Sequence, residues 1–185
     1  YTAHLPLDGH GLGTAALQGV HLLRRADGST FPSRRRARDG DEVPDPEAIR
    51  WLPNGNLLWT SEGSVTRGMG PALHESQADG RLVRSFALPS MFDANLGGGT
   101  GPRDNQALEG LALTPDGRTA WLAMEDALIQ DGPLPRIGAA GAACRITAVD
   151  VASGRALRQI AYVPDPIPAR GPLPGLTPPV VYADN

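Results

Sequence analysis

Lysine is absent from this sequence: its 17 basic residues are all arginine, set against 20 acidic residues, and the formal net charge is −3. Without lysine, these 185 residues contain no Walker A phosphate loop and no Schiff-base lysine. The single Cys144 excludes an internal disulfide and a cysteine metal cluster. A slightly negative net charge does not favour binding to nucleic acid or to an anionic membrane, so we expect no nucleic-acid partner.

Long apolar runs are missing too. No segment approaches the roughly 18 apolar residues of a membrane helix, so we expect no membrane span in this chain, and no signal peptide is recognisable. Helix-breaking residues are abundant instead, with 23 glycines and 18 prolines, which argues against a helical bundle. The chain starts at Tyr1 and stops at Asn185 inside a strand-like segment, so we expect it to be an excerpt of a longer protein.

Short turn sequences divide the chain. Asn-Gly and Asp-Gly pairs supply the positive φ that tight hairpins need, and apolar runs of strand length lie on both sides of the turns. Five such turns predict about ten strands and little helix, so we expect an all-β chain. The turns are Ala26–Gly28, Pro53–Asn56, Ala78–Arg81, Pro115–Arg118 and Ala152–Arg155.

Two of the hairpins resemble each other. Glu47–Trp59 aligns with Glu109–Trp121, and Glu, Pro, Gly and Trp recur at the same offsets. Another hairpin follows each copy, so one repeat would form a four-stranded sheet, which is the blade of a β-propeller. We therefore predict a β-propeller, with a β-sandwich as the alternative. The recurring tryptophans, Trp59 and Trp121, are expected to pack between blades.

This interpretation predicts one domain, residues 1–185, with about two and a half blades. Residues 45–89 and 105–163 would each form a blade, and residues 1–31 would form part of another. Residues 90–104 and 126–143, rich in Gly, Pro and Ala, would be inserted loops. Since propellers usually have about 4–8 blades, the predicted domain is incomplete.

Carboxylates recur at both ends of the first hairpin of each repeat. In a propeller, the first strand of a blade lines the channel and the second strand returns to the face where the first began. Strand starts and strand exits therefore share one face, which would bring together Asp45, Glu47, Glu62, Asn105, Glu109 and Glu125. Clustered carboxylates repel unless they are protonated or bind a cation, and Ca²⁺ prefers oxygen ligands. The alternative for each position is a solvated or hairpin-capping side chain.

Arginines form a run in Arg34–Arg38, beside Asp39, Asp41 and Glu42. A solvated loop whose charges compensate one another is the expected structure, and contact with a phosphate is the alternative.

Several segments together resemble the phytase-like family, also described as "esterase-like activity of phytase". The first signature is matched by Asp45–Arg50, Pro53–Gly55 and Thr60–Gly63. The second signature is matched by Asn105–Ala112, Pro115–Gly117 and Ala123–Asp126. The similarity covers most of residues 45–163, and Asp184 with Asn185 resembles the start of a third acidic strand.

The resemblance implies a β-propeller of secreted or periplasmic bacterial proteins that hydrolyses phosphate or carboxyl esters. By analogy with calcium-dependent propeller phytases, carboxylates would hold Ca²⁺, which binds the substrate phosphate and activates water. The implied metal ligands are Asp45, Glu47, Asn105 and Glu109. Glu62 and Glu125 would be catalytic, as ligand or general base. Because lysines are absent, the substrate would be bound by Arg50, Arg67 and Arg103.

Two other functions stay open. A non-catalytic propeller would bind a protein, glycan or cell-wall ligand through its loop-rich face, because loops on a rigid scaffold carry recognition. A sugar-lactone hydrolase would hold one divalent ion on the propeller axis. The expected partner is accordingly a small-molecule ester or a cell-surface ligand. Carboxylates too far apart to share a cation would favour the binding propeller.

Overall fold

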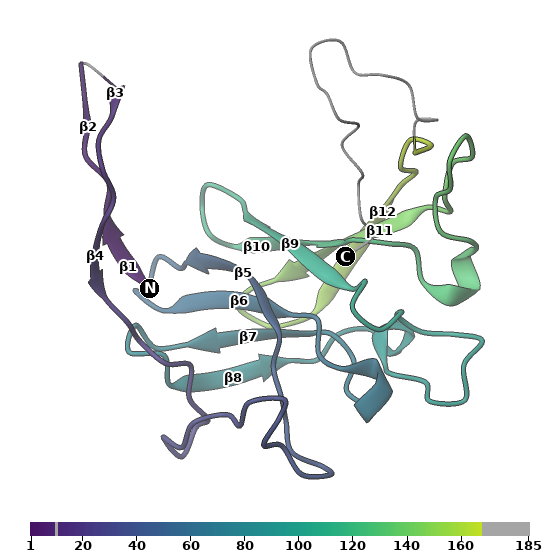
Figure 1. Cartoon of the computed structure of the whole chain (residues 1–185), viewed down its shortest axis with the longest axis horizontal. Helices are drawn as coiled ribbons and strands as arrows, with labels where there is room; N and C mark the ends of the chain where they lie inside the picture. The colour runs from purple at the N-terminus through teal and green to yellow at the C-terminus, as the bar shows by residue number, and fades with distance from the viewer. Residues whose placement is uncertain (10, 168–185) are drawn as a thin grey trace.

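The computed structural model describes residues 1–9 and 11–167. Within them the chain has twelve strands and three short 3-10 turns, so the prediction of an all-β chain is confirmed (Figure 1). No helix in this part of the chain is long and apolar enough to span a membrane.

Two four-stranded antiparallel sheets form the body of the molecule (Figure 1). The first sheet has the order β5-β6-β7-β8, with strands β5 (Pro46–Trp51), β6 (Leu57–Ser61), β7 (Ala72–Ser76) and β8 (Leu82–Phe86). The second sheet has the same consecutive order, with strands β9 (Leu108–Leu113), β10 (Thr119–Met124), β11 (Cys144–Asp150) and β12 (Ala156–Tyr162). Each sheet is therefore a meander with the strand number and order of a propeller blade.

Four of the five predicted turns close the hairpins of these sheets. The exception is the turn at Ala26–Gly28, where the N–H of Gly28 donates to the carbonyl of Arg25 at 2.9 Å and only an isolated bridge joins Arg24 to Thr30. The sequence pattern identified the turn correctly but overestimated the strands beside it.

The two sheets pack face to face on a shared apolar core. The strand alternation of β10 buries Ala120, Leu122 and Met124 against the first sheet, which contributes Leu58 and Leu73. Between the sheets, the closest association is where β5 and β6 meet β9. Consecutive meanders that meet at their first strands are the arrangement of neighbouring propeller blades, which favours the propeller over the sandwich.

Residues 1–9 and 11–19 build a separate ribbon. Strands β1 (Thr2–His4) and β4 (Ala16–Gly19) pair with each other, and β2 (Leu7–Asp8) pairs with β3 (Gly11–Leu12). Figure 1 shows this ribbon extending away from the two sheets, and nearly all of its residues are exposed. The partial blade expected in residues 1–31 stays a prediction.

The predicted insertions contribute to the core. They contain two of the 3-10 turns, η2 (Ser90–Phe92) and η3 (Ile129–Asp131), and they bury Phe92 and Leu128 between the sheets. The N–H of Ile129 donates to the carbonyl of Gly101 at 3.0 Å and ties one insertion to the other. The third 3-10 turn, η1 (Val65–Arg67), follows β6. The predicted third strand start at Asp184 and Asn185 lies outside the described residues.

The recurring tryptophans do not occupy equivalent positions. Trp59 pairs with Ile49, whereas Trp121 pairs with Ala112. In the first sheet the N–H of Leu52 donates to the carbonyl of Asn56, whereas in the second sheet the N–H of Thr114 donates to the carbonyl of Thr119. The hairpin turn of the second sheet is therefore one residue longer. Because strand side chains alternate, this extra residue moves Trp121 to the other face of its sheet. Trp59 is buried and stacked on His74, while Trp121 is half-buried under the guanidinium of Arg158.

Candidate metal centre

Five carboxylates gather where β5 and β9 begin and where β6 and β10 end. Equivalent backbone bonds in both sheets bring strand start and strand exit together. The N–H of Glu62 donates to the carbonyl of Asp45 at 3.0 Å, and the N–H of Glu125 donates to the carbonyl of Ala107 at 2.7 Å. The sequence predicted this juxtaposition for Asp45, Glu47, Glu62, Glu109 and Glu125, and the structure shows it.

The carboxylates form two groups that share one member. Oxygens of Asp45, Glu47 and Glu62 lie within 4.8 Å of one another, and so do oxygens of Glu62, Glu109 and Glu125. Ligand oxygens about 2.3–2.6 Å from a Ca²⁺ ion are separated by distances of this order. The donor set therefore fits a hard divalent cation at either group, and Glu62 could serve both.

Glu62 is held more firmly than the other members. It is only 4% exposed, and its Oε1 accepts a hydrogen bond from the N–H of Ala107 at 2.5 Å. The next residue, Gly63, has φ +76, and a Cβ there would lie 2.3 Å from the carbonyl oxygen of Gly70. The turn after Glu62 consequently requires glycine.

Burial and mutual repulsion raise the pKa of several carboxylates in the cluster. Partial burial, followed by repulsion from Glu109 and Asp45, raises the pKa of Glu47 to about 7. Burial and then repulsion from Glu109 also raise the pKa of Glu125, and burial raises the pKa of Glu62 although the bond from Ala107 opposes it. A carboxylate that retains a proton near neutral pH is one that a cation would stabilise in its charged form.

The remaining predicted site residues are Asn105 and three arginines. Asn105 is exposed and has a left-handed backbone, φ 58, three residues before the strand that carries Glu109, and its role as a metal ligand stays a prediction. Arg50 is exposed on β5, and its Nη1 donates to the carbonyl of Ile49 at 2.7 Å. Arg67, in η1, donates from Nη2 to the carbonyl of Arg38 at 2.7 Å.

Arg103 is engaged by the chain itself. Its two terminal nitrogens donate to the carbonyls of Ala127 and Gly132, the latter at 2.7 Å. These bonds anchor the 126–143 loop, so the side chain has a structural task here. Its role in substrate binding, like those of Arg50 and Arg67, stays a prediction.

Sequence reasoning missed a charged residue beside the cluster. Asp104 accepts a hydrogen bond from the N–H of Thr66 at 3.2 Å, and its Oδ2 lies 3.8 Å from Nη2 of Arg34. Its charge is one of the influences that raise the pKa of Glu62. The available signal was its position directly before Asn105, but nothing local indicated the contact with the arginine-rich loop.

Comparison with known protein families gives a match over nearly all of the chain. The family described as "Phytase-like: Esterase-like activity of phytase" matches residues 1–182. The chain belongs to the phytase-like family. Neither the curated proteins nor the solved structures that were compared contain a match.

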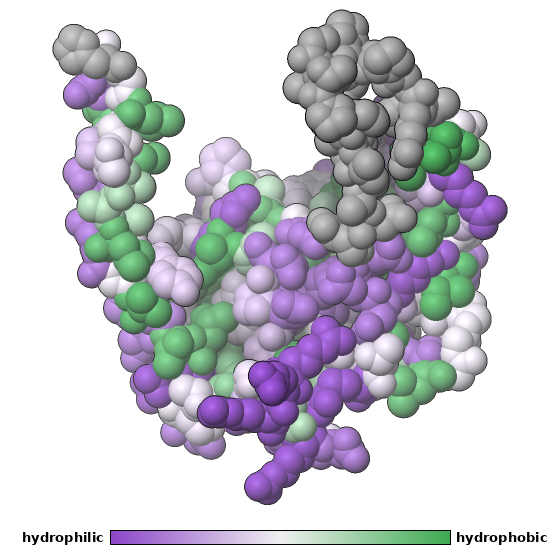
Figure 2. All heavy atoms as spheres, viewed as in Figure 1, coloured by the Kyte–Doolittle hydropathy of each residue, from purple (hydrophilic) through white to green (hydrophobic). Residues whose placement is uncertain are grey.

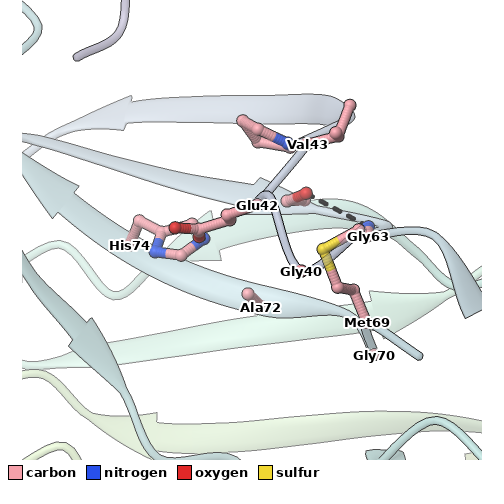
Figure 3. A pocket seen from close by; sticks show the side chains of 10 residues that line it. Gly40, Glu42, Val43, Gly63, Met69, Gly70, Ala72 and His74 are labelled. Atoms are coloured by element: carbon pink, nitrogen blue, oxygen red, sulfur yellow. Dashed lines mark hydrogen bonds and ion pairs between the residues drawn. The ribbon is translucent and has the colours of Figure 1, made fainter. Parts of the chain in front are cut away.

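This phytase-like chain also has a cavity of about 290 Å³ whose lining includes Ser61 and Gly63 (Figure 3). Glu42 and His74 point toward each other in it, with 3.9 Å between Oε1 and Nε2, and Nδ1 of His74 lies 2.8 Å from the Ser85 hydroxyl. Burial lowers the pKa of His74 to about 4. The ring is therefore neutral at pH 7, and as such a weak base it is poorly suited to activating Ser85.

Proposed function

We propose that this chain carries the active centre of a Ca²⁺-dependent hydrolase of phosphate esters. The observation that carries the proposal is the sharing of Glu62 between two groups of carboxylates, each compact enough to hold one cation. Membership of the phytase-like family supports ester hydrolysis as the chemistry. Carboxylates this close together also argue against the non-catalytic propeller, for which separated side chains were expected.

The carboxylates of the two groups would share the work. Asp45 and Glu47 would help to hold one cation and Glu109 the other, each together with the buried Glu62, whose carboxylate is fixed by its bond to Ala107. Ca²⁺ would supply positive charge for substrate oxygens and would acidify a water molecule. We assign Glu125, which is exposed and has a raised pKa, as the base that accepts the proton from the attacking water.

The proposal extends to an extracytoplasmic location. Three of the five carboxylates are exposed and Asp45 is partly buried, and a site of this kind resembles the weak Ca²⁺ sites of extracellular modules, with dissociation constants of roughly 10⁻⁴–10⁻³ M. Such a site would be filled in the periplasm or outside the cell. Activity should accordingly be recovered from the periplasmic or secreted fraction of the source cells.

Hydrolysis of p-nitrophenyl phosphate and p-nitrophenyl acetate, with Ca²⁺ and with a chelator, tests the proposal. We expect Ca²⁺-dependent turnover of the phosphate ester that Glu109→Gln abolishes. Asp39→Asn is the matched control, because Asp39 is an exposed aspartate outside both carboxylate groups. Full activity in chelator, or in Glu109→Gln, would contradict the mechanism. Turnover of a sugar lactone alone would support the lactonase alternative, and no turnover would favour the binding propeller.

A further inference from the structure

The cavity of about 290 Å³ in Figure 3 is lined by the loop that precedes β5 and by residues at the end of β6 and the start of β7. Val43, Pro44 and Met69 contribute apolar side chains to its walls, and Glu42 and His74 contribute its two ionisable side chains. At about 30 Å³ for each water molecule, the cavity could hold roughly ten of them. It is therefore large enough for a small organic molecule.

His74 presents to this cavity a nitrogen without a hydrogen-bond partner. Its side chain is only 3% exposed, and Nδ1 lies 2.8 Å from the Ser85 hydroxyl. Nε2 points toward Glu42, whose Oε1 at 3.9 Å is beyond hydrogen-bonding distance (Figure 3). Nε2 thus has no hydrogen-bond partner within residues 1–9 and 11–167, and it is not sealed off from the cavity. Because the polar atoms of buried side chains are almost always paired, Nε2 indicates a ligand or solvent molecule in the cavity.

Neighbouring side chains fix the ring of His74. Its centroid is 4.3 Å from that of the Trp59 ring, and Nε1 of Trp59 donates to Oγ of Ser76 at 2.9 Å. Burial lowers the pKa of His74 to about 4, so the ring carries a single proton at neutral pH. A proton on Nε2 would draw the Glu42 carboxylate to about 3 Å, whereas a proton on Nδ1 can be donated to Ser85. The observed 3.9 Å therefore favours the proton on Nδ1, which leaves a lone pair on Nε2 facing the cavity.

Glu42 gives the cavity a negative charge. Its side chain is 46% exposed, and within the described part of the chain no arginine forms an ion pair with it. The described residues that line the cavity include no arginine, although Arg34–Arg38 belongs to the same loop. Figure 2 shows strongly hydrophilic residues gathered over this loop, at the lower edge of the view. The charge of Glu42 should repel an anionic ligand and attract a cationic one.

We propose that this cavity binds a small organic molecule through a primary ammonium group, which donates to Nε2 of His74 and to the carboxylate of Glu42. Two acceptors 3.9 Å apart can share one nitrogen at ordinary hydrogen-bond distances of about 2.9 Å. The apolar walls would contact the carbon chain of the ligand. Neither His74 nor Glu42 belongs to the carboxylate groups of the candidate metal centre, so the inference does not depend on the proposed function.

A metal ion fits this cavity less well than an ammonium group. Among the lining residues that the structure describes, only Glu42 and His74 are of the types that commonly bind zinc, whereas zinc sites use three or four protein ligands. An ammonium group has three N–H donors, so it can satisfy both acceptors and keep one donor for a backbone carbonyl or water.

Calorimetric titration of the whole protein in chelator, at neutral pH, tests this assignment. The probes are n-pentylammonium, its neutral isostere 1-pentanol, and pentyltrimethylammonium, which has the charge but no N–H donor. We expect n-pentylammonium to bind with a Kd at least about tenfold lower than either of the others, because only this probe forms charge-assisted hydrogen bonds. If either control probe bound as tightly, the assignment would be overturned.

Two substitutions locate the site. Glu42→Gln removes the charge from an exposed side chain, and it should raise the Kd of n-pentylammonium at least about tenfold while binding of 1-pentanol stays unchanged. His74→Phe keeps a ring to stack on Trp59 but removes Nε2, and it should weaken n-pentylammonium to a similar extent. Asp39→Asn is the matched control, since Asp39 is exposed in the same loop but does not line the cavity. Equal affinities in Glu42→Gln and Asp39→Asn would overturn the assignment, even if His74→Phe failed to fold.

Long-range ¹H–¹⁵N NMR spectra of the His74 ring give a readout that a merely structural role would not move. Nδ1 should have the shift of a protonated nitrogen, and n-pentylammonium should change the shift of Nε2. A proton on Nε2, or no response there, would overturn the assignment. Binding of Zn²⁺ through His74, without binding of n-pentylammonium, would overturn the choice of ligand. Because all of these measurements are made without Ca²⁺, failure of the inference would leave the proposed function intact.

Discussion

The carboxylate of Glu62 accepts a hydrogen bond from the backbone N–H of Ala107 at 2.5 Å, across the boundary between the two sheets. Glu62 directly follows the second strand of one sheet, and Ala107 directly precedes the first strand of the other. The same carboxylate belongs to both candidate cation sites. One side chain therefore couples the packing of the sheets to the geometry of the metal centre.

Two substitutions of Glu62 should separate these tasks. Glu62→Gln keeps an oxygen acceptor for Ala107 but removes the charge, so the unfolding free energy in chelator should be maintained or increased while Ca²⁺ affinity is lost. Glu62→Ala leaves a buried N–H without an acceptor and should cost about 1–3 kcal/mol. Urea unfolding in chelator and calorimetric Ca²⁺ titration measure the two effects. Equal destabilisation by both variants would contradict the role of the hydrogen bond.

The raised pKa of Glu47 predicts a pH-dependent stability of the metal-free protein. Folding favours the protonated carboxyl, so its contribution is complete below the ordinary pKa of 4.5 and is lost as pH rises through about 7. Ca²⁺ binds the charged form and should therefore raise Tm more at pH 8 than at pH 5.5.

Buried His74 has the opposite effect, because its lowered pKa makes the folded protein less stable as pH falls below 6.5. The test therefore compares wild type with Glu47→Gln, in which the contribution of His74 is the same. In chelator, the variant should gain stability relative to wild type at pH 8 and little at pH 5. A difference that does not change with pH would show that Glu47 titrates normally.

Gly63 and Gly55 form a matched pair of left-handed glycines. A Cβ at Gly63 would meet the backbone oxygen of Gly70 at 2.3 Å, whereas a Cβ at Gly55 would meet nothing within 4 Å. Gly55→Ala should cost about 1–2 kcal/mol for the left-handed conformation alone. Gly63→Ala should cost at least about 2 kcal/mol more, because backbone must shift, and it should weaken Ca²⁺ binding by displacing Glu62. Equal unfolding free energies for the two variants would refute the steric argument.

Arg84 joins the first sheet to the last hairpin of the second. It donates to Glu75 at 2.7 Å and to the carbonyls of Val151 and Ala152 at 2.6 and 3.0 Å. Burial alone would raise the pKa of Glu75, but bonds from Asn56, Arg84 and Asn54 outweigh it and lower the pKa.

Arg84→Met should therefore destabilise the protein by about 1–3 kcal/mol in urea unfolding. Arg81→Met, in the same hairpin, is the control, because Arg81 is exposed and its side chain bonds to Gln77; it should change the unfolding free energy by less than about 0.5 kcal/mol. Similar losses in both variants would show that the link between the sheets carries no stability.

Much of the architecture could be predicted from the sequence because short local patterns of residues specify it. Asn54-Gly55 and Asp116-Gly117 specify tight turns through the conformations that they permit. Alternation along Thr119–Met124 specifies a strand with one buried face. In a four-stranded blade, the first strand starts at the same face where the second strand ends. Once such blades were inferred, this chain direction alone predicted the carboxylate cluster, without any knowledge of side-chain contacts.

The sequence by itself therefore determined the all-β fold, the hairpins and the gathering of the carboxylates. Only the tertiary structure decided that Glu62 is shared and bonded to Ala107, that Asp104 holds Arg34 beside the cluster, and that Arg103 is bound to backbone carbonyls. It also placed Trp59 and Trp121 on unlike faces, although their sequences align. The physical reason is that strand faces alternate with every residue, so one extra turn residue reverses a face, and that contacts between distant segments depend on packing that no local pattern encodes.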